Sequence, residues 1–237
     1  MKKVLLYSGG MDSWLIDKIW KPDLKVYVNM HTRYSEEEIK RLKEKNADVT
    51  IVDFPLGQWE RDDAIIPLRN LYLIMVICNI TGSEDVEICL GATAGDRVLD
   101  KSPTFVEKAN DLLNYLYQPQ HWIPEGKKVK INIDFKSKTK TQLIKMFVDN
   151  GGDILDAFNE SFSCYDPVDG KECWQCKPCF RKFVSFALNG MWFPEEVCDK
   201  VIDYIMKEIY PSIENGTYGR AEEEKEIKLV LQAYGKI

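Results

Sequence analysis

Close to its first residue the chain reads Val4-Leu5-Leu6-Tyr7-Ser8-Gly9-Gly10-Met11-Asp12-Ser13. The apolar run Val4–Tyr7 favours a β-strand, and residues Ser13–Trp20 follow a helical pattern. Two glycines between a strand and a helix let the backbone approach an anion closely, and the helix start adds N–H groups and a positive dipole. This stretch predicts the first turn of an α/β fold and a phosphate-binding loop made of Ser8, Gly9, Gly10, Met11, Asp12 and Ser13.

Further β-rich runs follow along the chain, at Lys25–Asn29, Val49–Phe54, Val86–Leu90 and Val129–Ile133. Helical patterns lie between them, at Ser35–Asn46, Leu68–Ile80 and Pro103–Leu116. Strands that alternate with helices indicate crossover connections and a parallel, doubly wound sheet. The sequence therefore predicts an α/β fold with a parallel five-stranded sheet. The pattern Leu68–Ile80 is apolar nearly all round, so we expect a buried helix that covers the sheet.

A second motif lies in the C-terminal part, where four cysteines are closely spaced, at Cys164, Cys173, Cys176 and Cys179. Two overlapping C-x-x-C steps bring three thiolates to one point, and Cys164 can return to them across the intervening loop. Four thiolates complete the coordination of zinc and leave no open position, so this metal would be structural. An iron–sulfur cluster also suits four cysteines, whereas a redox dithiol would leave two of them idle. For the other cysteines we expect burial among apolar residues, at Cys78, Cys89 and Cys198.

Helical patterns dominate the rest of the chain, at Thr141–Asn150, Phe180–Asn189, Pro194–Tyr210 and Arg220–Tyr234, with a loop at Pro211–Gly219. We therefore expect two regions. Residues 1–150 would form the α/β domain with the nucleotide-phosphate loop. Residues 151–237 would form a helical, zinc-binding appendage packed on the same domain.

The composition limits the class of partner. The 237 residues carry a net charge of −6, whereas a domain that grips nucleic acid usually has a basic surplus. The lysine-rich stretch 127–145 is interpreted as solvated surface. No targeting segment and no membrane-spanning apolar run are visible, and clustered thiols suit a reducing compartment. We expect a cytoplasmic protein that acts on a small molecule, without direct contact with nucleic acid or a membrane.

The loop at residues 8–13 lacks the spacing of the dinucleotide fingerprint and the ending of a Walker A loop. It resembles the Ser-Gly-Gly-X-Asp-Ser pyrophosphate loop (PP-loop) of the N-type ATP pyrophosphatases. Those enzymes split ATP between its α- and β-phosphates and transfer AMP to the substrate.

Together with the cysteine cluster, further motifs make the chain similar to the 7-cyano-7-deazaguanine synthases over about residues 2–190. The motifs are Pro67-Leu68-Arg69-Asn70, Gly91-Ala92 with Asp96, Thr139-Lys140, Ser163-Cys164-Tyr165 and Arg181. Two segments depart from the family pattern. Where the family has Tyr-Gly-Gln-Arg, this chain has Met30-His31-Thr32-Arg33; the family's Tyr-Pro-Asp-Cys-Arg is shortened to Leu99-Asp100-Lys101-Ser102. Since those segments would read the substrate heterocycle, they bear on substrate identity. His31, after the second strand, is a further pocket candidate.

The resemblance implies an adenine nucleotide alpha hydrolase-like fold and an ATP-dependent carbon–nitrogen ligase of queuosine-type 7-deazapurine biosynthesis. Such an enzyme converts 7-carboxy-7-deazaguanine and ammonia to 7-cyano-7-deazaguanine by adenylating first the carboxylate and then the amide. It also implies ATP, Mg²⁺ and Zn²⁺ as cofactors and a homodimer. With no glutaminase module apparent, ammonia would come from solution.

The resemblance also carries roles onto single residues. The loop residues Ser8, Gly9, Gly10, Met11 and Ser13 would cradle the phosphates of ATP. The catalytic candidates are Asp12, which would help to hold magnesium, and Lys140 and Arg69, which would supply positive charge. The candidate substrate contacts are Arg33, Asn70, Asp96 and Asp100, and the carboxylates among them suit the N–H donors of a deazaguanine.

Three alternatives stay open from the sequence. The enzyme could stop at 7-amido-7-deazaguanine, since the substrate segments are altered. It could be a PP-loop tRNA sulfurtransferase, although that activity needs catalytic thiols and a basic RNA surface. It could also be a non-catalytic zinc module that binds protein or nucleic acid, which would leave the phosphate loop unexplained.

Overall fold

The computed structural model describes residues 1–45 and 48–237, which form two compact units made of interleaved segments. The sheet unit contains Met1–Gly9, Trp20–Ala92 and Asp96–Lys136. The helical unit contains Gly10–Ile19, Thr93–Gly95 and Ser137–Ile237. The division at residue 150 that the sequence suggests stays a prediction.

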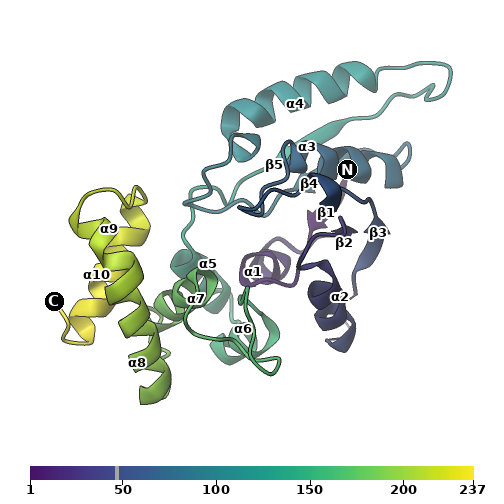
Figure 1. Cartoon of the computed structure of the whole chain (residues 1–237). Helices are drawn as coiled ribbons and strands as arrows, with labels where there is room; N and C mark the ends of the chain where they lie inside the picture. The colour runs from purple at the N-terminus through teal and green to yellow at the C-terminus, as the bar shows by residue number, and fades with distance from the viewer. Residues whose placement is uncertain (46–47) are drawn as a thin grey trace. The chain divides into compact units, whose positions relative to one another are not determined.

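The sheet unit is built on a parallel sheet (Figure 1). In the described residues its strands are β1 (Lys2–Leu6), β2 (Leu24–Asn29), β3 (Thr50–Asp53), β4 (Val86–Cys89) and β5 (Val129–Asn132), in the order β3-β2-β1-β4-β5. Leu5 lies beside Lys25 of β2 and Cys89 of β4. The strand order reverses next to β1, and ligands bind at the carboxyl ends of strands at such a point. The expected α/β fold with a five-stranded parallel sheet is confirmed.

The α-helices of the sheet unit, within the described residues, are α2 (Ser35–Glu44), α3 (Arg69–Ile80) and α4 (Pro103–Leu116). The predicted end of the α2 helix at Asn46 lies outside the described residues. Helix α4 lies along the edge strand β5, where Asn110 accepts the Ile131 N–H at 2.8 Å and Asn114 bonds both backbone groups of Val129. These amides occupy backbone groups that an edge strand would otherwise expose to another chain.

Helix α3 covers the sheet as expected, although it is buried on one face only. Ile74 and Ile77 are fully buried against the sheet core, whereas Met75, on the opposite face of the helix, is 43% exposed. That outer face borders a groove of about 670 Å³ between α3 and α4, which Leu112 of α4 also lines. The sheet covers one side of the helix, and the apolar residues on the other side are left at this groove.

The helical unit contains α1, except its last residue, and the described helices from α5 onward. In the described residues these are α1 (Met11–Trp20), α5 (Lys140–Asp149), α6 (Ile154–Glu160), α7 (Lys177–Ala187), α8 (Glu195–Tyr204), α9 (Tyr210–Glu214) and α10 (Ala221–Ala233). The short helix α6 was not expected from the sequence. Its seven residues make about two turns, too few for a hydrophobic period to stand out.

The pattern Pro194–Tyr210 does not form one regular helix that ends before Pro211. Helix α8 runs into a π-helical turn at Ile205–Ile209, and α9 continues to Glu214. Pro211 has no N–H to donate to the preceding turn, yet it is tolerated in the first turn of a new helix. The predicted loop therefore begins one turn later than expected.

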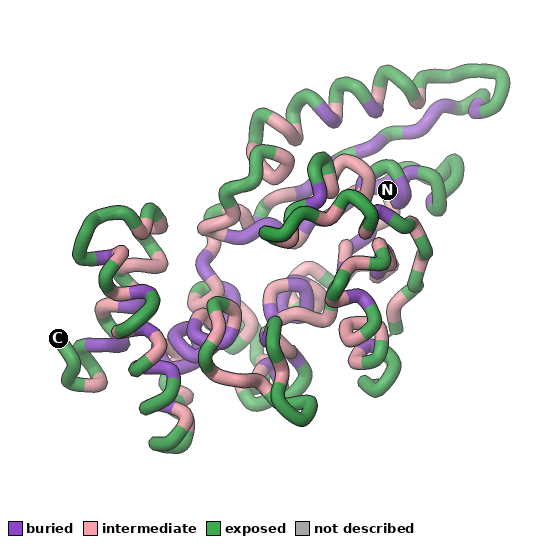
Figure 2. The backbone as a smooth tube through the Cα atoms, viewed as in Figure 1, coloured by how far each residue is buried: buried purple, intermediate pink, exposed green. Residues whose placement is uncertain are grey.

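Helix α7 forms the centre of the helical unit and is buried along most of its length (Figure 2). Phe180 and Phe183 are fully buried and pack with Val201 of α8 and Ile227 of α10. Among the described residues, no helix is both long enough and apolar enough to cross a bilayer.

Candidate functional site

The loop after β1 requires glycine at its first bend. Gly9 has a φ of 73°, a backbone conformation that residues with a side chain rarely adopt. A Cβ at this position would also lie only 3.1 Å from Cδ2 of Leu42. Helix α1 then starts at Met11, because the Trp14 N–H donates to the Gly10 carbonyl at 3.0 Å. The Ser13 hydroxyl donates to the same carbonyl at 3.0 Å, which fixes the serine within the first turn.

The first turns of α1 and α5 meet through an ion pair. The Lys140 ammonium donates to both carboxylate oxygens of Asp12, and both side chains remain about a quarter exposed, at 26% and 27%. A cation in the first turn of a helix is repelled by the positive end of the helix dipole. The Lys140 ammonium therefore needs a neighbouring anion, which Asp12 provides. The pair is accessible to a ligand, and it joins two catalytic candidates that are 128 residues apart.

Thr139 begins α5 as its N-cap. Its hydroxyl accepts the Gln142 N–H at 3.2 Å, and the Gln142 side chain accepts the Thr139 N–H at 3.0 Å. This reciprocal pair is a capping box, which fixes where a helix starts. Lys140 therefore occupies the first helical position rather than the residue before the helix.

In the sheet unit, two of the candidate substrate residues are joined. The Asn70 N–H, at the start of α3, donates to a carboxylate oxygen of Asp100 at 3.1 Å. Burial raises the pKa of Glu38, and the charge of Arg69, the residue before Asn70, offsets part of this rise. Asn70 is buried and Arg69 is half-buried.

The other two substrate candidates are held by neighbours in the sheet unit. Asp96 pairs with the Lys101 ammonium at 3.2 Å, and its carbonyl accepts from Lys136 at 2.5 Å. Arg33 bonds Glu60 at 3.1 Å and the Arg61 carbonyl at 2.7 Å. Both residues therefore anchor loops, and their roles as substrate contacts stay predictions.

A polar cluster at the carboxyl ends of β2 and β3 was missed as a group. Asn29 and Asp53 are register partners, and the Asn29 amide donates to Asp53 at 2.6 Å. His31 lies 3.1 Å from the same carboxylate oxygen. The sequence does show a polar residue at the end of each of these two strands. Placing the two residues side by side, however, requires knowing that β2 and β3 are neighbours in the sheet.

The four clustered cysteines come together as expected. Their sulfur atoms all lie within 4.8 Å of one another, and a tetrahedral zinc ion with Zn–S bonds of about 2.3 Å spaces its ligands by about 3.8 Å. The Cys173 and Cys179 sulfurs are 4.0 Å apart, which fits ligands of one ion. An iron–sulfur cluster interposes several atoms between the thiolates and spreads them further. The set could hold a single zinc ion.

The backbone around these cysteines favours thiolates. The Cys173 N–H donates to the Cys164 sulfur at 3.3 Å, and the Gln175 N–H donates to the Cys173 sulfur at 3.4 Å. The Cys179 thiol donates to the Cys176 sulfur, which lowers the pKa of Cys176, whereas this bond and burial raise the pKa of Cys179. With four sulfur ligands the metal would have no open position, so its contribution would be to order this loop.

A buried ion pair supports the same loop. Lys182 of α7 donates to Glu172 at 3.0 Å and to the carbonyls of Phe158 and Ser161 at 3.2 and 2.8 Å. Glu172 also accepts the Ser163 N–H at 2.8 Å. Because Glu172 precedes Cys173 and Ser163 precedes Cys164, the pair holds both arms of the loop. No sequence motif pointed to this lysine.

We expect the purified protein to contain about one zinc ion per chain and the Cys173→Ser variant to lose it. The variant should melt about 5–10 °C lower, since each kcal/mol lost shifts the midpoint by about 2–4 °C for a chain of this size. Metal analysis and thermal unfolding check both points. Cys89→Ala, which alters a buried cysteine outside the cluster, should keep its zinc. Iron and visible absorption bands in the wild type would contradict the assignment.

Comparison with known proteins agrees with the motifs. Residues 48–190, more than half of the chain, match the family description "Queuosine biosynthesis protein QueC". The 7-cyano-7-deazaguanine synthase 1 of Colwellia psychrerythraea is 25% identical over 224 residues, which covers 81% of this chain and 97% of that protein. The 7-cyano-7-deazaguanine synthase of a Marinomonas species is 26% identical over 227 residues, with 82% and 97% covered. That of Rickettsia africae is 25% identical over 228 residues, with 81% and 97% covered.

Proposed function

The chain belongs to the QueC family of queuosine biosynthesis proteins, and from this premise we propose that it is a 7-cyano-7-deazaguanine synthase. In this proposal it uses ATP and ammonia to convert the carboxylate of 7-carboxy-7-deazaguanine to a nitrile. The observation that carries the proposal is the ion pair between Lys140 and Asp12. It gathers, at the first turns of two helices, one group suited to phosphate and one suited to the magnesium ion that accompanies ATP.

The first step is adenylation, because a carboxylate has oxide as its leaving group and reacts poorly with ammonia. A carboxylate oxygen attacks the α-phosphorus of ATP, and the bond to the β-phosphate breaks to release pyrophosphate. Lys140 would move from Asp12 to the phosphates and offset the charge that develops there, while the loop amides hold the departing pyrophosphate. Asp12 would hold the magnesium ion that accompanies ATP, and this ion would supply further positive charge to the phosphates.

Ammonia then attacks the acyl carbon, AMP leaves, and a proton is released to give the amide. The amide oxygen attacks a second ATP in the same way, and loss of AMP with the two remaining N–H protons leaves the nitrile. The protein would provide the same groups twice. Ordering the substrate would rest with Arg69, Arg33, Asn70, Asp96 and Asp100. A carboxylate accepts several hydrogen bonds, so Asp100 can cap α3 and still accept an N–H of the heterocycle.

Mass spectrometry tests the proposal after incubation of the protein with ATP, magnesium, ammonium and 7-carboxy-7-deazaguanine. We expect the nitrile, with about two AMP molecules formed for each nitrile molecule, since each nitrile requires two adenylations. Amide without nitrile would place the chain among enzymes that stop after one round. AMP formed only with another carboxylate would keep the chemistry and overturn the substrate.

ATP binding separates an enzyme from a non-catalytic zinc module. We expect Asp12→Ala to weaken the binding of ATP with magnesium, measured by titration calorimetry. Asp149→Ala alters an exposed carboxylate on α5 that pairs with Lys145, and it should bind ATP as the wild type does. Absence of ATP binding by the wild type would leave the zinc module as the better interpretation.

A further inference from the structure

Helix α10 follows the segment that matches the family, yet two of its carboxylates point into the helical unit. Glu223 and Glu226 are three residues apart, so they lie on the same face of the helix. The Glu223 side chain is only 15% exposed. The first turn of α10 also contains Glu222 and Glu224, but these two form ion pairs with lysines of the same helix.

Glu223 joins three groups at the start of α10. It accepts the Arg181 Nε–H at 2.7 Å, the Tyr218 hydroxyl, and an Arg220 N–H at 3.1 Å. Burial alone would raise the pKa of Glu223, but the charge of Arg181 and these hydrogen bonds outweigh it and lower that pKa. A Cβ on Gly95 would lie 2.9 Å from Arg220, so the loop after β4 rests against this arginine.

Glu226 reaches the start of α5. Its carboxylate accepts the Thr139 hydroxyl at 2.5 Å across 87 residues of sequence. A hydroxyl has a single hydrogen to donate, and Thr139 gives it to Glu226 while its oxygen accepts the Gln142 N–H. The capping box that sets the first turn of α5 is therefore clamped to α10. Lys140 is the next residue.

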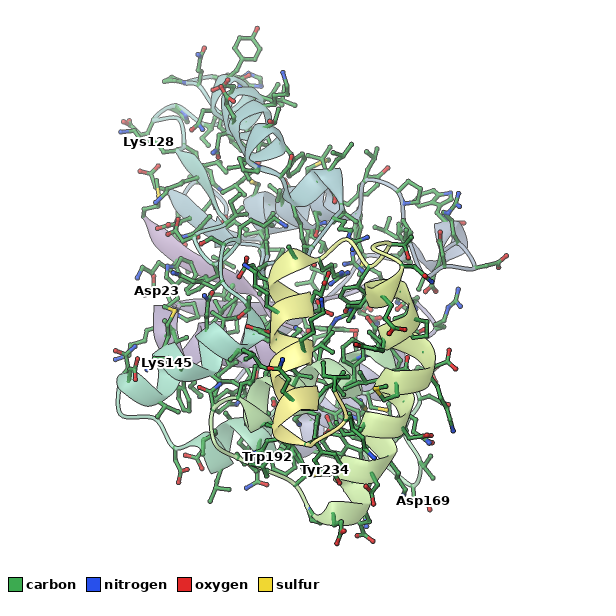
Figure 3. The ribbon with its side chains drawn as sticks, turned by 90° about the vertical axis from the view of Figure 1, so that its left-hand side faces the viewer. Asp23, Lys128, Lys145, Asp169, Trp192 and Tyr234 are labelled. Atoms are coloured by element: carbon green, nitrogen blue, oxygen red, sulfur yellow. The ribbon has the colours of Figure 1, made fainter. Side chains whose placement is uncertain are left out.

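The far end of α10 also makes contacts within the helical unit. The Tyr234 ring lies against Trp192 (Figure 3), with ring centroids 6.2 Å apart and planes 18° apart. The Tyr234 hydroxyl donates to Asp199 at 2.8 Å. Ile227 and Val230 between these ends are fully buried.

We propose that Glu226 is a positioning residue for Lys140, acting through Thr139, and that α10 thereby forms part of the nucleotide-binding machinery. The inference rests on the proposed function, because it assigns the purpose of the clamp to the ammonium that meets ATP. Without the carboxylate, the Thr139 hydroxyl is free to turn, the first turn of α5 loosens, and Lys140 loses its fixed position beside the phosphate loop. Small misplacements of a charged group are costly where charge is to be stabilised.

Titration calorimetry with ATP and magnesium tests the proposal without requiring turnover. We expect Glu226→Ala to raise the ATP dissociation constant about tenfold, and Glu226→Gln, which keeps an oxygen acceptor, to stay within about threefold of wild type. In steady-state assays the KM for ATP should rise similarly while the KM for 7-carboxy-7-deazaguanine stays unchanged. Glu222→Ala on the same helix, whose partner is the exposed Lys225, should change neither constant.

The pair Thr139→Val and Glu226→Ala shows whether the effect passes through the threonine. If it does, the double variant has the same ATP affinity as whichever single variant binds ATP less tightly. A folded Glu226→Ala variant with wild-type ATP binding would overturn the proposal, as would equal losses for Glu226→Gln and Glu226→Ala. If the wild type binds ATP but makes no nitrile, the proposed reaction fails while the clamp is still tested by binding.

Discussion

Replacing Lys140 by methionine should lower kcat/KM for ATP about a thousandfold, the size of effect expected when a charge that stabilises a phosphoryl transition state is lost. Methionine keeps much of the length of the side chain and removes its charge. Lys140 is the cation that the structure brings to Asp12 at the first turn of α1. AMP release and product mass, followed over a range of ATP concentrations, measure the loss.

The stability of this variant should hardly change, which separates a catalytic role from a structural one. Removing a partly exposed ion pair costs about 0–1 kcal/mol. Removing a cation from the first turn of a helix stabilises the folded state by about 0.3–1 kcal/mol. The two effects oppose each other, so we expect a melting temperature close to that of the wild type.

Lys145→Met is the matched control. Lys145 lies on the same helix (Figure 3), its side chain is 68% exposed, and its partner is Asp149 one turn later. This variant should keep full activity. A Lys140→Met protein that retains more than about a tenth of wild-type kcat/KM would remove the lysine from the mechanism.

The parts of the site that could be predicted from the sequence are local ones. The cysteine cluster is a short segment whose spacing already indicates a metal site, and the structure brings its sulfur atoms together. The bend at Gly9 is also local, because its positive φ needs glycine, while the phosphate-binding role of that loop stays a prediction. Thr139 and Gln142 also had a local signal, since their spacing is that of a capping box. It would have placed the start of α5 at Lys140 rather than at Thr141.

The long-range contacts could not be predicted in this way. Glu226 is one of several glutamates in an acidic stretch, and only the fold distinguishes the one that bonds Thr139. Glu60, which bonds Arg33, gave no signal for the same reason. Charged residues are usually solvated, so a sequence interpretation assigns them to the surface unless a partner is known.

Replacing Lys182 by methionine should destabilise the protein by about 3–5 kcal/mol, the cost of leaving a buried charge without its partner. The Lys182 and Glu172 side chains are only 2% and 7% exposed. The substitution also leaves the carbonyls of Phe158 and Ser161 without this donor. Chemical denaturation measures the loss, and the thermal midpoint should fall by about 10 °C.

The carboxylate is the reason for the loss, so removing it as well should restore much of the stability. The double variant Lys182→Met with Glu172→Leu should be more stable than the single variant, since an apolar pair of similar volume often replaces a buried ion pair without large cost. Lys177→Met changes an exposed lysine on the same helix and should stay within about 0.5 kcal/mol of wild type. Because Glu172 and Ser163 adjoin Cys173 and Cys164, the single variant should also release zinc to a chelator more readily. A single variant as stable as the wild type would mean that water replaces the ammonium and that the pair does not hold the loop.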